Sequence, residues 1–145
     1  MKILLAIDGS KFSEAAASAV ITQARPQRDE VRVLYVVDIL TIQLPEMVAY
    51  YPGIEHARDA QRNSAEASVA KTAEFLRAQG LQVTTSVEMG NPKSKIIEDA
   101  AEWHADLIVL GSHGQTGLER FLMGSVSDTV ARHAHCSVQI VRIRP

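Results

Sequence analysis

Short aliphatic segments alternate with longer segments of helical composition along this chain of 145 residues. Segments 2–7, 31–37 and 106–110 are rich in Ile, Leu and Val, as the buried strands of a parallel sheet are. Segment 81–87 alternates apolar with polar residues, which predicts a less buried strand at an edge. Segment 137–143 is a fifth strand of mixed character. The alternation restricts the chain to the α/β class.

Four segments between these strands predict helices: 11–24, 54–79, 92–103 and 125–133. Ser10 is suited to cap the first helix, and Gly80 to end the second. Asn91 and Pro92 suit the N-cap and the first turn of the third. Five strands joined by helices predict a three-layer α/β/α domain around a five-stranded parallel sheet. The length predicts that residues 1–145 form a single domain.

Composition narrows the range of partners and compartments. The formal net charge is −2, which gives no electrostatic reason to expect a nucleic-acid partner. The single cysteine, Cys136, has no partner for an internal disulfide, which suits a reducing compartment. No apolar run approaches the roughly 20 residues that a membrane span needs, and the start of the chain lacks the pattern of a signal peptide. We therefore expect a cytoplasmic protein without a membrane partner.

A glycine motif follows the predicted strand 106–110. It consists of Gly111, Gly114 and Gly124-Ser125, in the pattern G-x2-G-x9-G-S, and it leads directly into the last predicted helix. Glycines let backbone N–H groups approach an anion, and a helix start adds unpaired donors and a favourable dipole. The spacing excludes the dinucleotide motif GxGxxG, and the chain has no Gly-Lys pair for a P-loop. The motif therefore predicts a phosphate site of another kind.

Two interpretations of this motif stay open. In the first, the first two glycines expose backbone donors to a ribose or an α-phosphate. Gly124 and the N–H groups of Ser125 and Val126 then bind the β- and γ-phosphates. In the second, the glycines only turn the chain, and Ser125 and Asp128 form a capping box. The carboxylate of Asp128 would then compete with a phosphate for the same donors.

The motif and its surroundings resemble the ATP-binding subgroup of the universal stress protein family. The likeness extends over the whole chain, from the opening strand with Asp8 and Ser13 to the closing segment 135–142. It implies a Rossmann-like, adenine-nucleotide hydrolase-like fold with strand order 3-2-1-4-5. In that order the switch point lies between strands one and four, which end at Asp8 and Gly111. Open α/β sheets bind ligands at such a point.

The resemblance also implies roles for individual residues. Ile7 and Asp8 would flank the adenine and ribose, and Val36 would present backbone groups to the adenine edge. Ser127, next to the phosphate helix, would join the site. Asp8 has a second interpretation, as a structural cap of the first helix. Ala6 departs from the family pattern, because ATP-binding members often carry proline there, and the change affects packing against the base more than hydrogen bonding.

Five further residues have weaker functional interpretations. His113 and Arg120 are candidate phosphate contacts, against the alternative that both are solvated loop side chains. His133, His135 and Cys136 suggest a metal site, but their spacing offers no fourth ligand and a helix-to-strand turn accounts for them. We expect no metal from the protein alone. Mg²⁺ would instead be carried by the nucleotide phosphates.

These observations favour an ATP-binding, homodimeric stress-response module, with AMP or ADP as other possible ligands. The family commonly dimerises through the last strand, here from Ser137 to Ile143, which offers unpaired backbone groups to a second copy. One rival function is a slow ATPase or nucleotidyl-transfer enzyme. The chain carries no P-loop lysine and no evident residue to orient an attacking water, so we expect weak hydrolysis at most. The other rival is a nucleotide-free scaffold that binds partners through the long segment 38–54.

Overall fold

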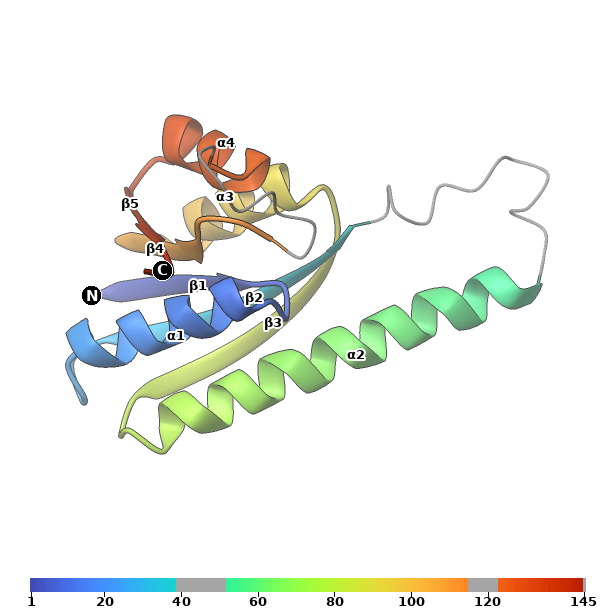
Figure 1. Ribbon diagram of the computed structural model, residues 1–145. Helices are drawn as coiled ribbons and strands as arrows, with labels where there is room; N and C mark the ends of the chain where they lie inside the picture. The colour runs from blue at the N-terminus through green and yellow to red at the C-terminus, as the bar shows by residue number, and fades with distance from the viewer. Residues whose placement is uncertain (39–51, 115–122, 145) are drawn as a thin grey trace.

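The computed structural model describes residues 1–38, 52–114 and 123–144 (Figure 1). Nine elements follow one another in the described residues: β1 (Lys2–Ile7), α1 (Lys11–Gln23), β2 (Glu30–Asp38), α2 (Pro52–Arg77), β3 (Gln82–Gly90), α3 (Pro92–Glu102), β4 (Leu107–Gly111), α4 (Ser125–His133) and β5 (Ser137–Val141). The sequence predicted each of them. The largest difference is at β3, which continues to Gly90 instead of ending at residue 87. The segment 39–51, within the predicted partner-binding segment, lies outside the described residues.

The five strands form one parallel sheet in the order β3-β2-β1-β4-β5. This confirms the order that the family resemblance implied. It also confirms the alternating segment, now β3, as an edge strand, and β5 forms the other edge. β1 lies at the centre, paired with β2 on one side and β4 on the other.

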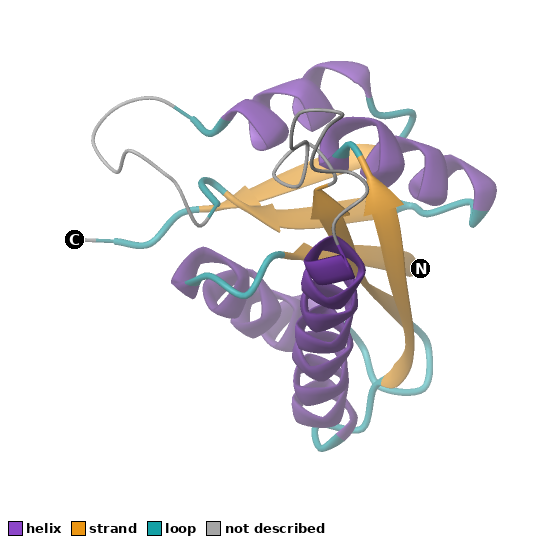
Figure 2. Ribbon diagram, turned by 90° about the vertical axis from the view of Figure 1, so that its right-hand side faces the viewer, coloured by secondary structure: helices purple, strands orange, loops and turns teal. Residues whose placement is uncertain are grey.

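Helices cover both faces of the sheet (Figure 2). The side chains of Ile3, Leu5 and Ile7 pack on one face with α1 and α2. Those of Leu4 and Ala6 pack on the other face with α3 and α4. Because β1 is buried on both faces, its sequence is aliphatic at successive positions rather than alternating.

α2 is attached to the sheet by its C-terminal half. Its buried side chains are Ala65, Val69, Ala73 and Leu76, which repeat at helical spacing. Residues 55–64 are exposed, and Figure 1 shows this half of the helix extending past the sheet. The helix ends before Gly80, whose φ of 83° is a conformation that glycine adopts easily.

Two predicted helix caps are confirmed. The Ser10 hydroxyl accepts a hydrogen bond of 3.3 Å from the N–H of Ser13 at the start of α1. The Asn91 side chain accepts one of 2.9 Å from the N–H of Lys93, and a proline begins α3.

Within the described part of the chain, none of the helices has the length and apolar character to cross a membrane.

Candidate functional site

The candidate site lies at the carboxyl ends of the central strand β1 and its neighbour β4. From β1, the chain proceeds to β2 and β3 on one side and later returns to β4 and β5 on the other. Such a switch point leaves a crevice outside the strand ends in open α/β sheets. The turns after the two strands approach each other closely. A Cβ on Gly114 would lie only 2.7 Å from Oδ2 of Asp8.

Asp8 is fixed by three neighbours. Its Oδ1 accepts hydrogen bonds from the N–H of Ser10 at 3.0 Å and from the hydroxyl of Ser13 at 2.7 Å. The same Ser13 hydroxyl accepts the Asp8 N–H at 2.8 Å. The hydroxyl of Tyr35 donates to the Asp8 carbonyl at 3.2 Å. One carboxylate oxygen thus stabilises the start of α1, while the other faces Gly114.

The structure explains why glycine occupies the motif positions, which the sequence alone did not show. A Cβ on Gly111 would lie 2.6 Å from Cβ of Phe12 and 2.9 Å from its backbone. A Cβ on Gly124 would lie 3.0 Å from the carbonyl oxygen of Ser112. In the described residues, the glycines with positive φ are Gly9, Gly80 and Gly90, so the motif glycines do not turn the chain by that conformation. They occur where the chain packs closely on itself.

The first turn of α4 is not capped by a side chain. Gly124 is the N-cap, and its N–H donates to the Ser112 carbonyl at 2.8 Å. The predicted capping box is wrong, because the Asp128 carboxylate contacts Nε of Arg132, with both oxygens at 3.1 Å. Ser125 already lies inside the helix, and Arg132 provides Asp128 with a partner one turn later. The first N–H groups of a helix have no partner within it, so those of α4 must find their acceptors elsewhere.

Ser127 and His113 both pack within the protein. Ser127 is 3% exposed, and its hydroxyl donates to the Gly111 carbonyl at 2.6 Å, which ties α4 to the end of β4. The His113 ring is tilted against Phe12 with 5.2 Å between centroids. Its Nδ1 lies 3.0 Å from the Ser112 hydroxyl. His113 is therefore a packed side chain rather than a freely solvated one, and Arg120 lies outside the described residues.

The side chains of Ile7 and Val36 are buried in the core at 6% and 9% exposure, so only their backbone could contact a ligand. The β1–β2 ladder ends with Ile7 opposite Tyr35. Val36 lies beyond that point, where β1 no longer covers that side of β2.

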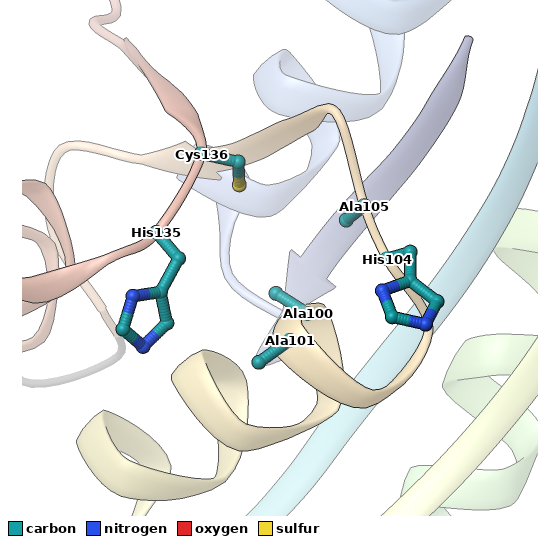
Figure 3. A pocket seen from close by; sticks show the side chains of 6 residues that line it. All are labelled: Ala100, Ala101, His104, Ala105, His135 and Cys136. Carbon is teal, nitrogen blue, oxygen red and sulfur yellow. The ribbon is translucent and has the colours of Figure 1, made fainter.

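A separate hollow of about 390 Å³ lies at the opposite, amino-terminal edge of β4 and β5 (Figure 3). Its walls include His104, His135 and Cys136. Burial, and then the charge of Asp106, raise the pKa of the Cys136 thiol, which disfavours the reactive thiolate. Among the residues that the structure describes, no three His, Cys, Asp or Glu side chains are grouped as metal ligands.

Comparison with known proteins identifies the relatives of this fold. The model of the universal stress protein family matches residues 1–142. The chain belongs to the universal stress protein family. It is 35% identical to universal stress protein YxiE of Bacillus subtilis, over 97% of this chain and 98% of that one. It is 34% identical to universal stress protein MJ0531 of Methanocaldococcus jannaschii, over 97% of this chain and 81% of that protein.

Solved structures of the family share the same architecture. UspA of Lactobacillus plantarum superimposes with a TM-score of 0.85 at 28% identity, covering 98% of this chain and 97% of the other. The shared architecture is the Rossmann-like, adenine-nucleotide hydrolase-like fold that the sequence implied. Two more distant relatives, at 24% and 17% identity and TM-scores of 0.68 and 0.66, were solved with cAMP and, in the Arabidopsis thaliana protein, with AMP. Each likeness covers at least 98% of this chain and 92% of the relative, and it concerns the fold alone.

Proposed function

We propose that this universal stress protein binds an adenine nucleotide, with ATP as its main ligand, at the carboxyl ends of β1 and β4. The observation that carries the proposal is that α4, whose N-cap residue provides no side-chain cap, starts against Ser112 and His113, in the turn whose Gly114 faces the Asp8 carboxylate. Where the structure describes the N-cap residue, α1 and α3 have a side-chain cap and α4 does not. An external anion is the natural partner for such a helix start.

The phosphate groups would be bound by backbone donors of α4. The N–H groups of Ser125, Val126 and Ser127 are the donors in question, because the N–H of Gly124 is already bonded to the Ser112 carbonyl. Removing the Asp128 carboxylate from this end, through its pairing with Arg132, takes away an internal competitor for those donors. Mg²⁺ would accompany the triphosphate, since it usually binds through phosphates and few carboxylates.

The nucleoside would lie across the ends of β1 and β2. Asp8 would accept hydrogen bonds from the ribose through Oδ2, the oxygen that faces Gly114. The backbone of Ile7 and Val36 would contact the base where the β1–β2 ladder ends. His113, beside Phe12, is within the same turn and remains a candidate phosphate contact. The relatives solved with cAMP and AMP support an adenine nucleotide as the ligand class.

We further propose that the protein acts as a homodimeric stress-response module in which the nucleotide is a ligand first. The β5 edge supports the dimer, because its side chains from Val138 to Val141 are only partly buried in one chain. An edge strand offers unpaired backbone groups to a second copy. Light scattering of the purified protein tests this arrangement: a monomer at micromolar concentration contradicts it.

The nucleotide proposal is tested by releasing the ligand from freshly purified protein with denaturant, and by calorimetry with ATP, ADP and AMP. Ser125→Glu should weaken ATP binding about tenfold or more, because it places a carboxylate at the positive end of α4. Ser125→Gln, which adds a side chain of similar size without charge, is the matched control. Ser125 is exposed, so neither change disturbs the core.

The outcomes separate the rival functions. An empty protein with no affinity for ATP overturns the proposal and favours a scaffold. Steady hydrolysis of Mg-ATP that Ser125→Glu reduces and Ser125→Gln preserves favours the slow ATPase.

A further inference from the structure

Tyr35 reaches across the end of β1 to contact Asp8. It lies in register with Ile7, the last residue of β1, and its hydroxyl donates to the Asp8 carbonyl at 3.2 Å. The ring packs against the buried pair Val37 and Ala65, so the core fixes its position. We infer that Tyr35 is a positioning residue for Asp8 in nucleotide recognition. This inference rests on the proposed function and adds a residue that neither the glycine motif nor the family resemblance indicated.

The hydrogen bond to the Asp8 carbonyl matters because this carbonyl belongs to the peptide between Asp8 and Gly9, which the glycine leaves free to rotate. Gly9 has a φ of 80°, and a glycine imposes little steric preference on the peptide before it. The bond from the Ser10 N–H to Oδ1 of Asp8 closes an Asx-turn across this same peptide. A rotation of the peptide would break that turn and leave Oδ1 with the Ser13 hydroxyl as a donor. Tyr35, by holding the carbonyl, therefore supports one of the two hydrogen bonds that orient the carboxylate.

The orientation of the carboxylate decides which oxygen is presented to a ligand. Ser10 and Ser13 both donate to Oδ1, so the carboxylate is turned with Oδ2 toward Gly114. A carboxylate oxygen in that position is suited to accept a ribose hydroxyl, as acidic residues do in other α/β nucleotide sites. The triphosphate, by contrast, would be bound at α4 without Asp8. Loss of the Tyr35 hydroxyl should therefore weaken the hydrogen bonding of Asp8 to the ribose hydroxyls and leave phosphate binding largely intact.

Tyr35→Phe removes the hydroxyl and keeps the ring in the core. The control is Ser18→Ala, which removes another hydroxyl that donates to a backbone carbonyl, at 3.0 Å to Glu14, on the exposed side of α1. Calorimetry compares ATP with its 2′-deoxy and 3′-deoxy analogues for each protein. The wild type and the control should prefer ATP, and Tyr35→Phe should reduce that preference about three- to tenfold, the effect of one hydrogen bond.

A purely structural role for Tyr35 predicts a different result. Tyr35→Phe would then lower the affinity for all three nucleotides by the same factor, or change only the melting temperature, and either result overturns the inference alone. A wild type that binds ATP and both deoxy analogues equally also overturns it, because Asp8 would then not read the ribose. A wild type that binds none of the three overturns the proposed function as well.

Discussion

The starts of α1 and α4 occupy equivalent places and are built in opposite ways. Each follows a central strand at the same edge of the sheet. At α1, the Ser10 side chain accepts the N–H of Ser13, and Asp8 accepts the N–H of Ser10. At α4, the N-cap is Gly124, which has no side chain to accept a hydrogen bond. The first helix start is capped by its own N-cap side chain, and the second is not.

A helix start can serve two purposes: a side-chain cap stabilises the helix, and an uncapped start can bind an anion. A good side-chain cap stabilises a helix by about 1 kcal/mol, so an uncapped start gives up that contribution in the free protein. A bound phosphate supplies acceptors and negative charge at the same point. The candidate site thus combines the turn after β1, which holds Asp8, with the turn after β4, whose Gly114 faces the Asp8 carboxylate.

The close packing between the end of β4 and the start of α1 gives the largest expected effect. In Gly111→Ala, the new Cβ would lie 2.6 Å from Cβ of Phe12, with backbone close behind it. We expect a loss of about 3 kcal/mol in the free energy of unfolding, measured by urea denaturation, because neither backbone can move freely. Gly53→Ala is the control, since a Cβ there has no atom within 4 Å. Equal stability of the two variants would show that β4 and α1 do not need this contact.

The tie between α4 and β4 gives the next effect. Ser127→Ala removes a buried hydroxyl that donates to the Gly111 carbonyl at 2.6 Å. We expect a loss of about 1–3 kcal/mol, because the carbonyl is left without its partner. Ser125→Ala changes the same residue type in the same turn at an exposed position, and it should stay within about 0.5 kcal/mol of wild type. A similar loss in both variants would contradict a specific role for Ser127.

The cap of α1 tests the turn after β1. Ser10→Ala removes the acceptor for the Ser13 N–H and should cost about 1 kcal/mol in the free energy of unfolding. Thermal and urea denaturation both measure this loss. An unchanged stability would mean that α1 does not depend on its cap, and the contrast with α4 would then lose its meaning.

The sequence predicted the features that depend on residues close together in the chain. Apolar runs predicted the strands, and Ser10 and Asn91 predicted two helix starts, because a cap acts within three residues of its helix. The sheet order came from the family resemblance, since parallel strands can be ordered in several ways. The capping box failed for a local reason: the pattern fits both a cap at Ser125 and a helix that begins there, and α4 begins there.

The features that the sequence did not predict depend on contacts between distant parts of the chain. Gly111 is a glycine because Phe12 lies against it, and Tyr35 contacts Asp8 across two strands. Neither pair is visible in a single sequence. The family resemblance implied that Ser127 joins the phosphate site, but only the fold shows that its hydroxyl donates to the Gly111 carbonyl.

The open start of α4 gives the smallest effect on stability and the sharpest test of the comparison. Ser125→Glu should raise the free energy of unfolding by about 0.3–1 kcal/mol at low ionic strength, because a negative charge interacts favourably with an uncapped helix start. The gain should shrink in high salt, and Ser125→Gln should show none. Equal stability of the two variants at low salt would mean that α4 presents no unneutralised donors. The same substitution is expected to weaken ATP binding. A variant that is more stable than wild type but binds ATP less tightly would show that this position is adapted to the ligand rather than to the stability of the fold.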